Sequence, residues 1–431
     1  MRFSSLQEWL TWQEGLHPSA IELGLKRVTK VFNRLHPTLP SVPVITVAGT
    51  NGKGSSVALL ESIYQNAGYK TGAYTSPHLL RYNERIHLNG EEVSDEAICE
   101  AFERIDQARL NKSQDDENEE ISLTYFEFGT LAALDIFYRE KPDIIILEVG
   151  LGGRLDVVNI IDADVALITS IGIDHVAWLG NDRETIAKEK AGIMRKGRPV
   201  IFSSPDMPKS ISESANEVGA ILYQRGVDFD WKKGMGYAAW EWNSNNQQRT
   251  ALPHSNLRGE HQLDNAAGVL MAIELLANKL PVNQKQIKDG LLSVSVAGRF
   301  ECRFGDPMHI LDVAHNEASM ARLAELLNLQ VCGGNNVAVL GMLDDKLHAE
   351  SLAVMLPEIS QWYIADLDVP RGAKAEQLAA VLKNLDKNTK VTCFTTVQQA
   401  IEAADSAAES GDRVIIFGSF HTVELAMRVG I

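Results

Sequence analysis

The feature that most constrains the fold is an apolar run that leads directly into a glycine-rich loop. Residues 42–48 (VPVITVA) are apolar and mostly β-branched, which predicts a buried strand. The loop over residues 49–55 reads GTNGKGS, and a helical pattern then runs over residues 57–66 until Gly68. This order of strand, loop and helix is the context that a phosphate-binding loop requires. The sequence therefore predicts a nucleotide site here, and an ordinary tight turn is the alternative.

The residue types in the loop suit a phosphate. Backbone N–H groups approach a phosphate most closely at glycine, and the positive end of the following helix attracts it. Lys53 would reach the terminal phosphates, and a hydroxyl of Ser55 or Thr50 would help to hold Mg²⁺. The loop departs from the general Walker pattern, because Val47 replaces its first glycine and Gly54 separates the lysine from the serine.

The alternation of strands and helices continues along the chain. Further buried strands are expected over residues 143–149, 164–170 and 199–203, with helices over 124–139, 183–194 and 263–278. This order predicts a parallel sheet covered by helices on both faces. Residues 228–256, which hold three tryptophans, predict an irregular β-hairpin. The acidic stretch 111–120 predicts a solvated loop.

A chain of 431 residues is too long for one ordinary core, so two domains are expected. The pattern restarts near residues 290–298, which predicts an N-terminal domain over 1–293 and a C-terminal domain over 294–431. Strands of the second domain are expected over residues 309–313, 337–341, 362–365, 391–394 and 413–418. The predicted class is α/β, with an N-terminal P-loop-type parallel-sheet ATPase domain and a smaller, Rossmann-like C-terminal domain.

Composition excludes several classes of function. The formal net charge of −16 disfavours nucleic acid and anionic membranes as general partners. The four cysteines are scattered without a C-x-x-C pair, which predicts free thiols and no zinc site. No apolar run approaches the roughly 20 residues that span a bilayer. The N-terminus has no signal-peptide pattern, so a cytoplasmic enzyme is expected.

Polar residues follow several of the predicted strands. Glu148 ends the second strand, and Asp174 and His175 follow the third. The carboxyl ends of parallel strands share one edge of a sheet, so these side chains would lie near the phosphate loop and could bind Mg²⁺. The alternatives are a glutamate paired with a lysine and a histidine that merely satisfies its hydrogen bonds.

Basic residues near the same edge have two interpretations. Arg154 and the segment 81–85 (RYNER) could bind an anionic substrate or form surface ion pairs. Lys190 has the pattern of an exposed charge on a helix. In the second domain, Asp312 ends a strand and could bind a ribose, and His315 opens a helix that could face phosphate. Helix capping is the alternative for that segment.

Longer collinear motifs connect these positions over nearly the whole chain. They are GLKRV (24–28), VAGTNGKGS (47–55), TSPHL (75–79), RYNERI (81–86), SLTYFE (122–127), EVGLGGRLD (148–156), TSIGIDH (169–175), EKAGI (189–193), GRF (298–300), DVAHN (312–316) and GSFHTV (418–423). Together they resemble the folylpolyglutamate synthase/dihydrofolate synthase family of the Mur-type ADP-forming amide ligases. SLTYFE resembles the bacterial bifunctional members.

The resemblance implies a role for each matching residue. ATP contacts are implied for Thr50, Asn51, Gly52, Lys53, Gly54, Ser55, Asn265, Arg299 and Asp312. Two magnesium ions are implied at Ser55, Ser76, Glu148 and His175, with a monovalent cation as a further expectation. Catalytic roles are implied for Lys53, for His315 near the transferred phosphate, and for Lys190 as a carbamylated lysine. The pterin site is implied at Gly24, Leu25, Lys26, Arg27, Thr124, Tyr125, Phe126, Glu127, Leu155, Asp156 and Val157.

The resemblance also implies the reaction. A carboxylate of dihydropteroate or of a reduced folate would be phosphorylated by ATP, and the amine of L-glutamate would then attack the acyl phosphate. A monomer is expected. A monofunctional folate-tail enzyme, a cell-wall ligase of the same superfamily and an ATP-hydrolysing regulatory protein are the alternatives. Ala297 and Glu317 stand where the family usually has proline, which affects the expected local loop geometry.

Overall fold

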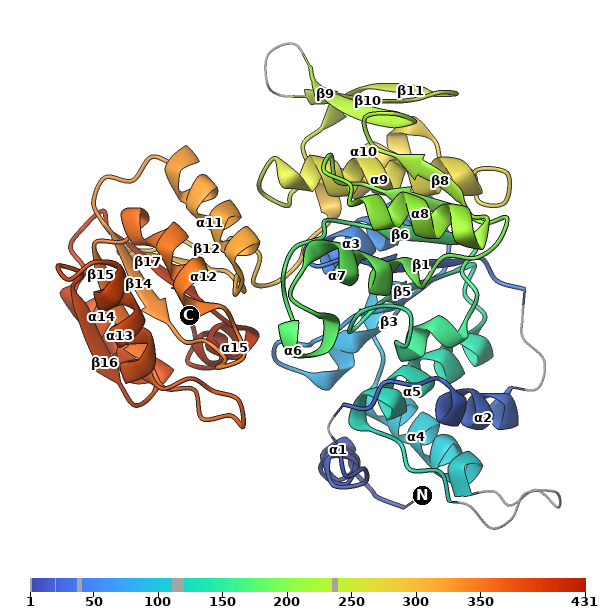
Figure 1. The fold of residues 1–431 in the computed structure, drawn as a ribbon, viewed down its shortest axis with the longest axis horizontal. Helices are drawn as coiled ribbons and strands as arrows, with labels where there is room; N and C mark the ends of the chain where they lie inside the picture. The colour runs from blue at the N-terminus through green and yellow to red at the C-terminus, as the bar shows by residue number, and fades with distance from the viewer. Residues whose placement is uncertain (1, 20, 37–40, 111–119, 235–238) are drawn as a thin grey trace.

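The computed structural model describes residues 2–19, 21–36, 41–110, 120–234 and 239–431. Its helices and strands form two α/β units that lie side by side, each around its own sheet (Figure 1). The predicted α/β class is confirmed. Most of the expected loop over residues 111–120 lies outside the described residues.

The sheet of the first unit has the strand order β4-β3-β2-β5-β1-β6-β7-β8. Strands β2, β5, β1, β6, β7 and β8 are parallel. The bounds are β1 Val44–Ala48, β2 Thr71–Tyr74, β3 Ile86–Leu88, β4 Glu91–Glu92, β5 Ile144–Glu148, β6 Val165–Ile168, β7 Pro199–Phe202 and β8 Ile221–Gln224.

The parallel sheet that the sequence predicts is extended at one edge by two antiparallel strands. Strand β3 pairs antiparallel with β2, and β4 pairs antiparallel with β3. A parallel neighbour needs a long crossover, usually through a helix, and the connections between these strands are short. Strands β3 and β4 are therefore added to the edge of the sheet as antiparallel neighbours.

Alternating residues of the central strands pack on opposite faces. In β1, Val44 and Ala48 face the core formed by α1, α2, α4, α5, α7 and α8, whereas Ile45 and Val47 face the core formed by α3, α9 and α10. The helices are α1 Leu6–Glu14, α2 Lys26–Leu35, α3 Lys53–Asn66, α4 Asp95–Leu110, α5 Tyr125–Glu140, α6 Val176–Leu179, α7 Arg183–Ala191, α8 Lys209–Val218, α9 His261–Leu276 and α10 Gln284–Ser293, with short 3-10 helices η1 Tyr82–Arg85 and η2 Val157–Ile160. Helices thus cover both faces, as expected for buried parallel strands.

The tryptophan-rich segment forms a three-stranded antiparallel sheet rather than one hairpin. Its strands are β9 Phe229–Lys233, β10 Ala239–Ser244 and β11 Gln248–Pro253, with β10 in the centre. Trp240 and Trp242 are fully buried, and the Trp242 indole N–H donates to the Ala267 carbonyl of α9 at 3.1 Å. The alternation along β10 therefore turns one face of this small sheet onto α9.

The second unit has the strand order β12-β13-β17-β14-β15-β16, parallel except for β12. Helices α11, α12 and α13 cover one face, and α14 and α15 cover the other. The strands are β12 Glu301–Arg303, β13 Met308–Leu311, β14 Asn336–Leu340, β15 Gln361–Ala365, β16 Val391–Phe394 and β17 Arg413–Phe417. The helices are α11 Glu317–Leu329, α12 His348–Met355, α13 Ala375–Leu385, α14 Val397–Ala407 and α15 Phe420–Arg428, and the 3-10 helix η3 is Leu356–Glu358. Residue 294, the predicted domain boundary, lies between α10 and β12.

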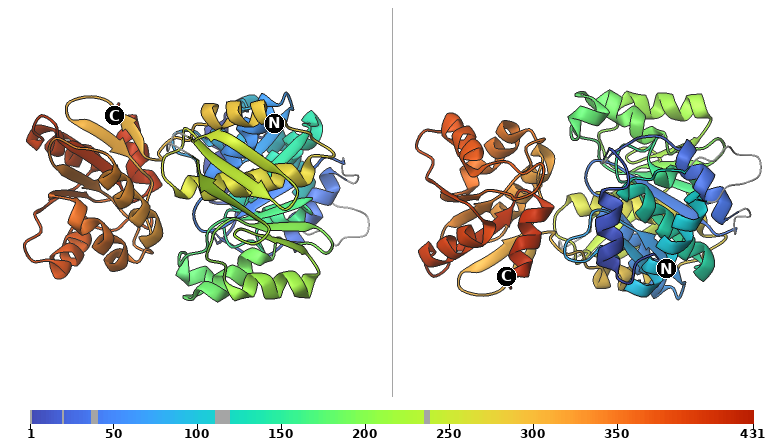
Figure 2. Two further views of the ribbon diagram at one scale, coloured as in Figure 1. Left: turned by 90° about the horizontal axis from the view of Figure 1, so that it is seen from above. Right: turned by 90° about the horizontal axis from the view of Figure 1, so that it is seen from below.

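The two units lie beside each other (Figure 2), and one of their contacts is made by the loop of the first unit that follows β2. Leu79, which follows β2, is 6% exposed and packs in the core of the second unit with Val313 and Val423. Arg428 of α15 donates to the Leu80 carbonyl at 3.1 Å. Among the described residues, no helix is long and apolar enough to cross a membrane.

Candidate active site

A cavity of about 860 Å³ lies between the two units. Its walls come mainly from loops that follow the strands: β1, β2, β5 and β6 in the first unit, and β13, β14 and β17 in the second. The carboxyl edges of the two sheets therefore face one space. All the residues predicted to bind ATP or magnesium or to act in catalysis line this cavity.

The phosphate loop joins β1 to α3 and needs glycine at two positions. Gly52 has φ +92°, and a Cβ there would lie 2.5 Å from the Asn265 side-chain oxygen. A Cβ on Gly49, which has φ +151°, would lie 1.8 Å from the Thr169 hydroxyl. Lys53 begins α3, and its ammonium donates to the carbonyls of Gly49 and Thr50 at 3.1 and 3.2 Å. The loop is thus a tight backbone turn with its lysine folded over it.

The two hydroxyls proposed for Mg²⁺ have different surroundings. The Thr50 hydroxyl donates to the Gly172 carbonyl and accepts from the Gly172 N–H, both at 3.0 Å. It therefore ties the loop to the segment after β6. The buried Ser55 hydroxyl accepts from Gln262 at 3.4 Å. The Ser55 hydroxyl is therefore less engaged in hydrogen bonds than the Thr50 hydroxyl.

Glu148 ends β5 beneath the phosphate loop and is 4% exposed. Its carboxylate accepts from the Ser76 backbone N–H at 3.1 Å. Burial raises the pKa of Glu148, while Lys53, the Ser76 N–H and Arg299 act in the opposite direction. The carboxylate therefore lies in a dry, cationic environment.

Lys190 on α7 is buried at 4% exposure, so its pattern as an exposed helix charge was misleading. Its ammonium donates to the Gly49 carbonyl at 2.9 Å. Burial, with a further effect of Lys53, lowers the pKa of Lys190 to about 7. A substantial share of this amine is therefore neutral near neutral pH.

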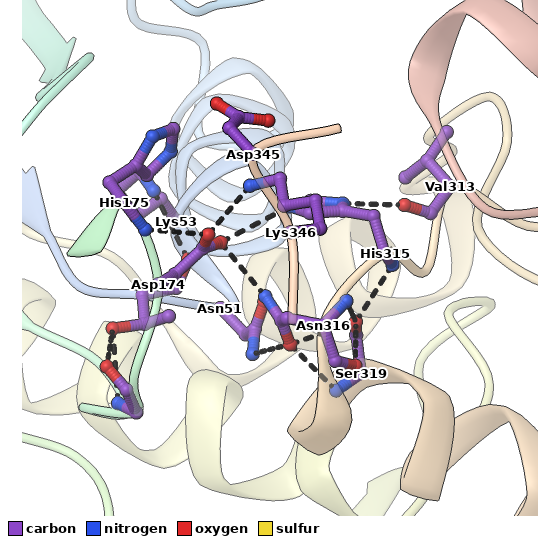
Figure 3. A network of polar contacts seen from close by, with 12 residues as sticks. Asn51, Lys53, Asp174, His175, Val313, His315, Asn316, Ser319, Asp345 and Lys346 are labelled. Carbon is purple, nitrogen blue, oxygen red and sulfur yellow. Dashed lines mark hydrogen bonds and ion pairs between the residues drawn. The ribbon is translucent and has the colours of Figure 1, made fainter. Parts of the chain in front are cut away.

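Asp174 and His175 follow β6 and face the second unit (Figure 3). Asp174 binds Lys346 at 2.6 Å and Asn316 at 3.0 Å, and His315 lies 3.3 Å away. Burial opposes ionisation of Asp174, but His315 and Lys346 hold its pKa well below the usual range. His175, at φ 51°, has a pKa lowered to about 4 mainly by burial. Its neutral ring can therefore ligate a metal.

Arg299 and Asp312 lie on the wall that the second unit contributes. The Arg299 guanidinium stacks on Phe420, 5.2 Å from the ring centre. Its Nη1 is buried and has no hydrogen-bond partner within the described part of the chain. Both Asp312 oxygens accept backbone N–H groups, from Phe300 and Ala314, at 2.8 Å. The unpartnered Arg299 nitrogen is a donor suited to an anion such as a nucleotide phosphate.

The predicted pterin residues form a separate group beside the cavity, since none of them, all described, lines its walls. They lie where α2, α5 and η2 pack together. Arg27 binds Glu127 at 2.7 Å, and Thr124 and Glu127 form a capping box at the start of α5. Asp156 caps η2 and also accepts from the Leu151 N–H at 2.8 Å. The Phe126 ring lies against Gly150, which lines the cavity, so this group adjoins it.

Comparisons with known proteins agree with this geometry. The model of the Mur ligase middle domain matches residues 47–273, and that of the Mur ligase glutamate ligase domain matches residues 298–420. The chain is 43% identical over 426 residues to the dihydrofolate synthase/folylpolyglutamate synthase of Escherichia coli K12, covering 99% of this chain and 96% of that protein. This chain belongs to the Mur ligase family.

Two solved structures resemble this Mur ligase over its whole length. E. coli FolC in complex with DHPP and ADP has a TM-score of 0.91 at 43% identity, and the match covers 99% of this chain and 97% of that one. A bifunctional folylpolyglutamate synthase/dihydrofolate synthase with Mn, AMPPNP and L-glutamate bound has a TM-score of 0.88 at 43% identity, with 99% and 98% covered.

The donor set of this Mur ligase fits a hard divalent cation that also binds phosphate oxygens. Among the described residues, no three His, Cys, Asp or Glu side chains come together as a complete metal site. Glu148, His175 and the two serines would supply only part of a coordination shell. Magnesium usually binds through one or two carboxylates, and substrate phosphates and water complete its shell. A Cβ on Gly54 would lie 3.9 Å from both Glu148 oxygens, so the glycine leaves the carboxylate open.

The basic residues that the sequence placed near this edge form two groups, one in the cavity wall and one outside the cavity. Arg85 lines the cavity, whereas Arg154 and Arg81 form ion pairs outside it with Glu189 and Glu92. The sequence analysis missed Lys346, whose side chain is 6% exposed in the cavity wall. Its position just after β14 at a carboxyl edge is the signal that could have identified it.

Proposed function

We propose that the chain is an ATP-dependent ligase that joins L-glutamate to dihydropteroate, forming dihydrofolate, and to the γ-carboxylate of reduced folates, forming folylpolyglutamates. One observation carries the proposal: a single cavity collects the phosphate-loop Lys53, the buried Glu148 and, from the second unit, Arg299 and His315. The relatives named above carry the names of these two activities.

The proposed reaction has two steps. A substrate carboxylate oxygen attacks the γ-phosphorus of ATP, and ADP leaves with the electron pair of the broken P–O bond. The product is an acyl phosphate. The amine of L-glutamate then attacks the acyl carbon and loses a proton, and inorganic phosphate leaves from the tetrahedral intermediate. Lys53 stabilises the transferring phosphoryl group, and the second unit covers the cavity so that water does not hydrolyse the acyl phosphate.

Magnesium at Ser55, Ser76, Glu148 and His175 would neutralise charge on the phosphoryl group. The chemistry of Lys190 supports its carbamylation. A neutral amine attacks CO₂, an N–C bond forms, and a proton is released. The lowered pKa of Lys190 supplies the neutral amine at physiological pH. The product is a carboxylate-like group that would offset the charge of Lys53 and orient the metal ligands.

The group formed by residues 24–27, 124–127 and 155–157 is the proposed pterin site. Its buried Glu127, which pairs with the partly exposed Arg27, fixes the start of α5, and Phe126 connects the group to the cavity through Gly150. A pterin bound there would direct its carboxylate toward the phosphate loop. We further propose a monomer, a cytoplasmic location, a monovalent cation in the site, and domains that meet at residue 294.

A mass-resolved assay tests the function. The protein is incubated with ATP, Mg²⁺ and L-glutamate, together with dihydropteroate or tetrahydrofolate, and products and ADP are quantified. We expect a product heavier by one glutamyl residue from each substrate, with one ADP per amide bond. Product from tetrahydrofolate alone would establish the monofunctional enzyme. ADP release without any amide product would refute the ligase assignment.

A further inference from the structure

The Asp174 carboxylate joins the two units at the edge of the phosphate loop. Within its own unit it accepts only the His175 backbone N–H, at 2.7 Å, among the bonds of the described residues. Its other partners, Lys346, Asn316 and His315, all belong to the second unit. Figure 3 shows these side chains converging on the carboxylate. Asp174 therefore interacts mainly with the opposite unit.

The contact is protected from water. The Asp174 and Lys346 side chains are 8% and 6% exposed. Removing one partner of a buried ion pair leaves the other charge buried without compensation, which is strongly unfavourable. Loss of either charge would therefore weaken the contact between the two loops.

The network continues to the phosphate loop. Asn316 caps α11 and exchanges two side-chain hydrogen bonds with Asn51, at 3.1 and 3.3 Å. Both ring nitrogens of His315 face oxygens, Nδ1 the Val313 carbonyl at 2.8 Å and Nε2 Asp174 at 3.3 Å. This fixes the ring direction. The loops after β13 and β14 are thus held in register with the phosphate loop by one carboxylate.

We propose that Asp174 is a positioning residue that docks the second unit on the phosphate loop, so that Lys346 and His315 are held at the transferring phosphate. Asp174 acts through the residues that it orients. Its loss should therefore lower turnover, while the phosphate loop still binds ATP. The kinetic consequence rests on the proposed function, whereas the docking does not.

A double-mutant cycle tests the inference. Asp174→Asn keeps a side chain of the same shape without the charge, and Lys346→Met removes the partner. We expect kcat to fall at least tenfold in each single variant, with KM for ATP changed less than threefold. The double variant should be no slower than the slower single variant, because both changes break one contact. A kcat within twofold of wild type for Asp174→Asn, or multiplicative effects in the double variant, would overturn the proposal.

Asp366→Asn is the matched control. Asp366 also pairs with a lysine, Lys374, at 2.9 Å, but that pair lies within the second unit and away from the cavity. The kcat of Asp366→Asn should match that of the wild type.

Small-angle scattering of each variant without substrates supplies a readout independent of ligation. We expect a larger radius of gyration for Asp174→Asn and Lys346→Met than for Asp366→Asn. An unchanged radius would refute docking, whereas expansion in a protein without ligase activity would refute only the proposed function.

Discussion

Two lysines lie side by side at the phosphate loop and have different surroundings. The ammonium groups of Lys53 and Lys190 both donate to the Gly49 carbonyl. Lys53 starts α3 and can extend toward a phosphate, whereas Lys190 is enclosed by α7 and the loop. Their mutual repulsion contributes to the lowered pKa of Lys190. Conversion of Lys190 to a carbamate would replace this repulsion by attraction.

Lys190→Ala tests the carbamate. We expect kcat to fall by roughly 10²-fold or more, a loss typical of a group that orients metal ligands. Short carboxylic acids added to the assay should restore part of the activity, because acetate or formate can occupy the vacated space. Lys188→Ala, at an exposed position of the same helix, is the control and should be fully active. Activity near wild type in Lys190→Ala would contradict the role.

Lys53→Ala tests the phosphate loop. Removing a charge that stabilises the phosphoryl group should lower folate-dependent ADP formation by roughly 10²–10³-fold. The measurement is coupled ADP release at saturating substrates, with Lys70→Ala as a surface control. Full turnover in Lys53→Ala would contradict the assignment of this loop as the site that binds the phosphates of ATP.

For single residues, the sequence predicted where the polar side chains lie along the fold better than it predicted their burial and their partners. Glu148 and Asp174 were recognisable because each follows a strand, and strand ends share an edge. Lys190 was not recognisable from charge pattern, because its burial depends on how α7 packs under a loop some 140 residues earlier in the chain. Lys346 was missed for a similar reason: its partner Asp174 lies on the other unit.

At the scale of elements, α3 and α10 pack closely against each other. Gly290 of α10 faces Ile63 of α3, and a Cβ there would lie 2.6 Å from the Ile63 Cα. Because α3 follows the phosphate loop directly, its packing against α10 helps to hold the helix that carries the loop. A shift of α10 would therefore be transmitted along α3.

Gly290→Ala should destabilise the protein even though alanine favours helices. The helix gains about 1 kcal/mol from alanine, but overpacking against a backbone costs about 1–3 kcal/mol. We expect a net loss of about 1 kcal/mol, seen as a lower urea midpoint. Lys285→Ala on the exposed side of α10 should leave the midpoint unchanged. A higher urea midpoint for Gly290→Ala than for the wild type would contradict this account of the packing between α3 and α10.

The elements that the sequence did not predict include short strands at one edge of the first sheet and the helices α1, α2 and α4. Strands β2, β3 and β4 span few residues, so alternation has no length over which to become visible. The third strand of the β9–β11 sheet was missed because β11 is largely exposed and polar, and its pairing with β10 has a register shift between Trp240 and Trp242. The long buried strands of both sheets were predicted to within two or three residues.

For the whole molecule, cohesion between the units depends on Leu79 as well as on Asp174. Its side chain fills space beside Gly298 and Val423 of the second unit. The loop that presents it is held by Glu84, whose carboxylate accepts the N–H groups of Leu79, Leu80 and Arg81 at 2.7 Å. The loop is therefore preformed for docking.

Leu79→Ala should loosen the interface. The lost packing is worth about 2–3 kcal/mol. We expect calorimetry to resolve two transitions where the wild type shows greater overlap, because the second unit is held less firmly against the first. Leu80→Ala, at a position 39% exposed, is the neighbouring control and should behave as wild type. Identical calorimetric traces for Leu79→Ala and wild type would contradict this role of Leu79.

The loop that ends in Leu79 also contains Ser76, whose N–H holds the Glu148 carboxylate. Leu79 is three positions after Ser76, a span of at most about 11 Å when the chain is fully extended. The loop is therefore a short link between the Glu148 carboxylate and the core of the second unit. If the two units separate by more than this loop can extend, either Leu79 leaves the core of the second unit or the Ser76 N–H loses its hydrogen bond to Glu148. Separation of the two units would therefore pull on the hydrogen bond that holds the Glu148 carboxylate.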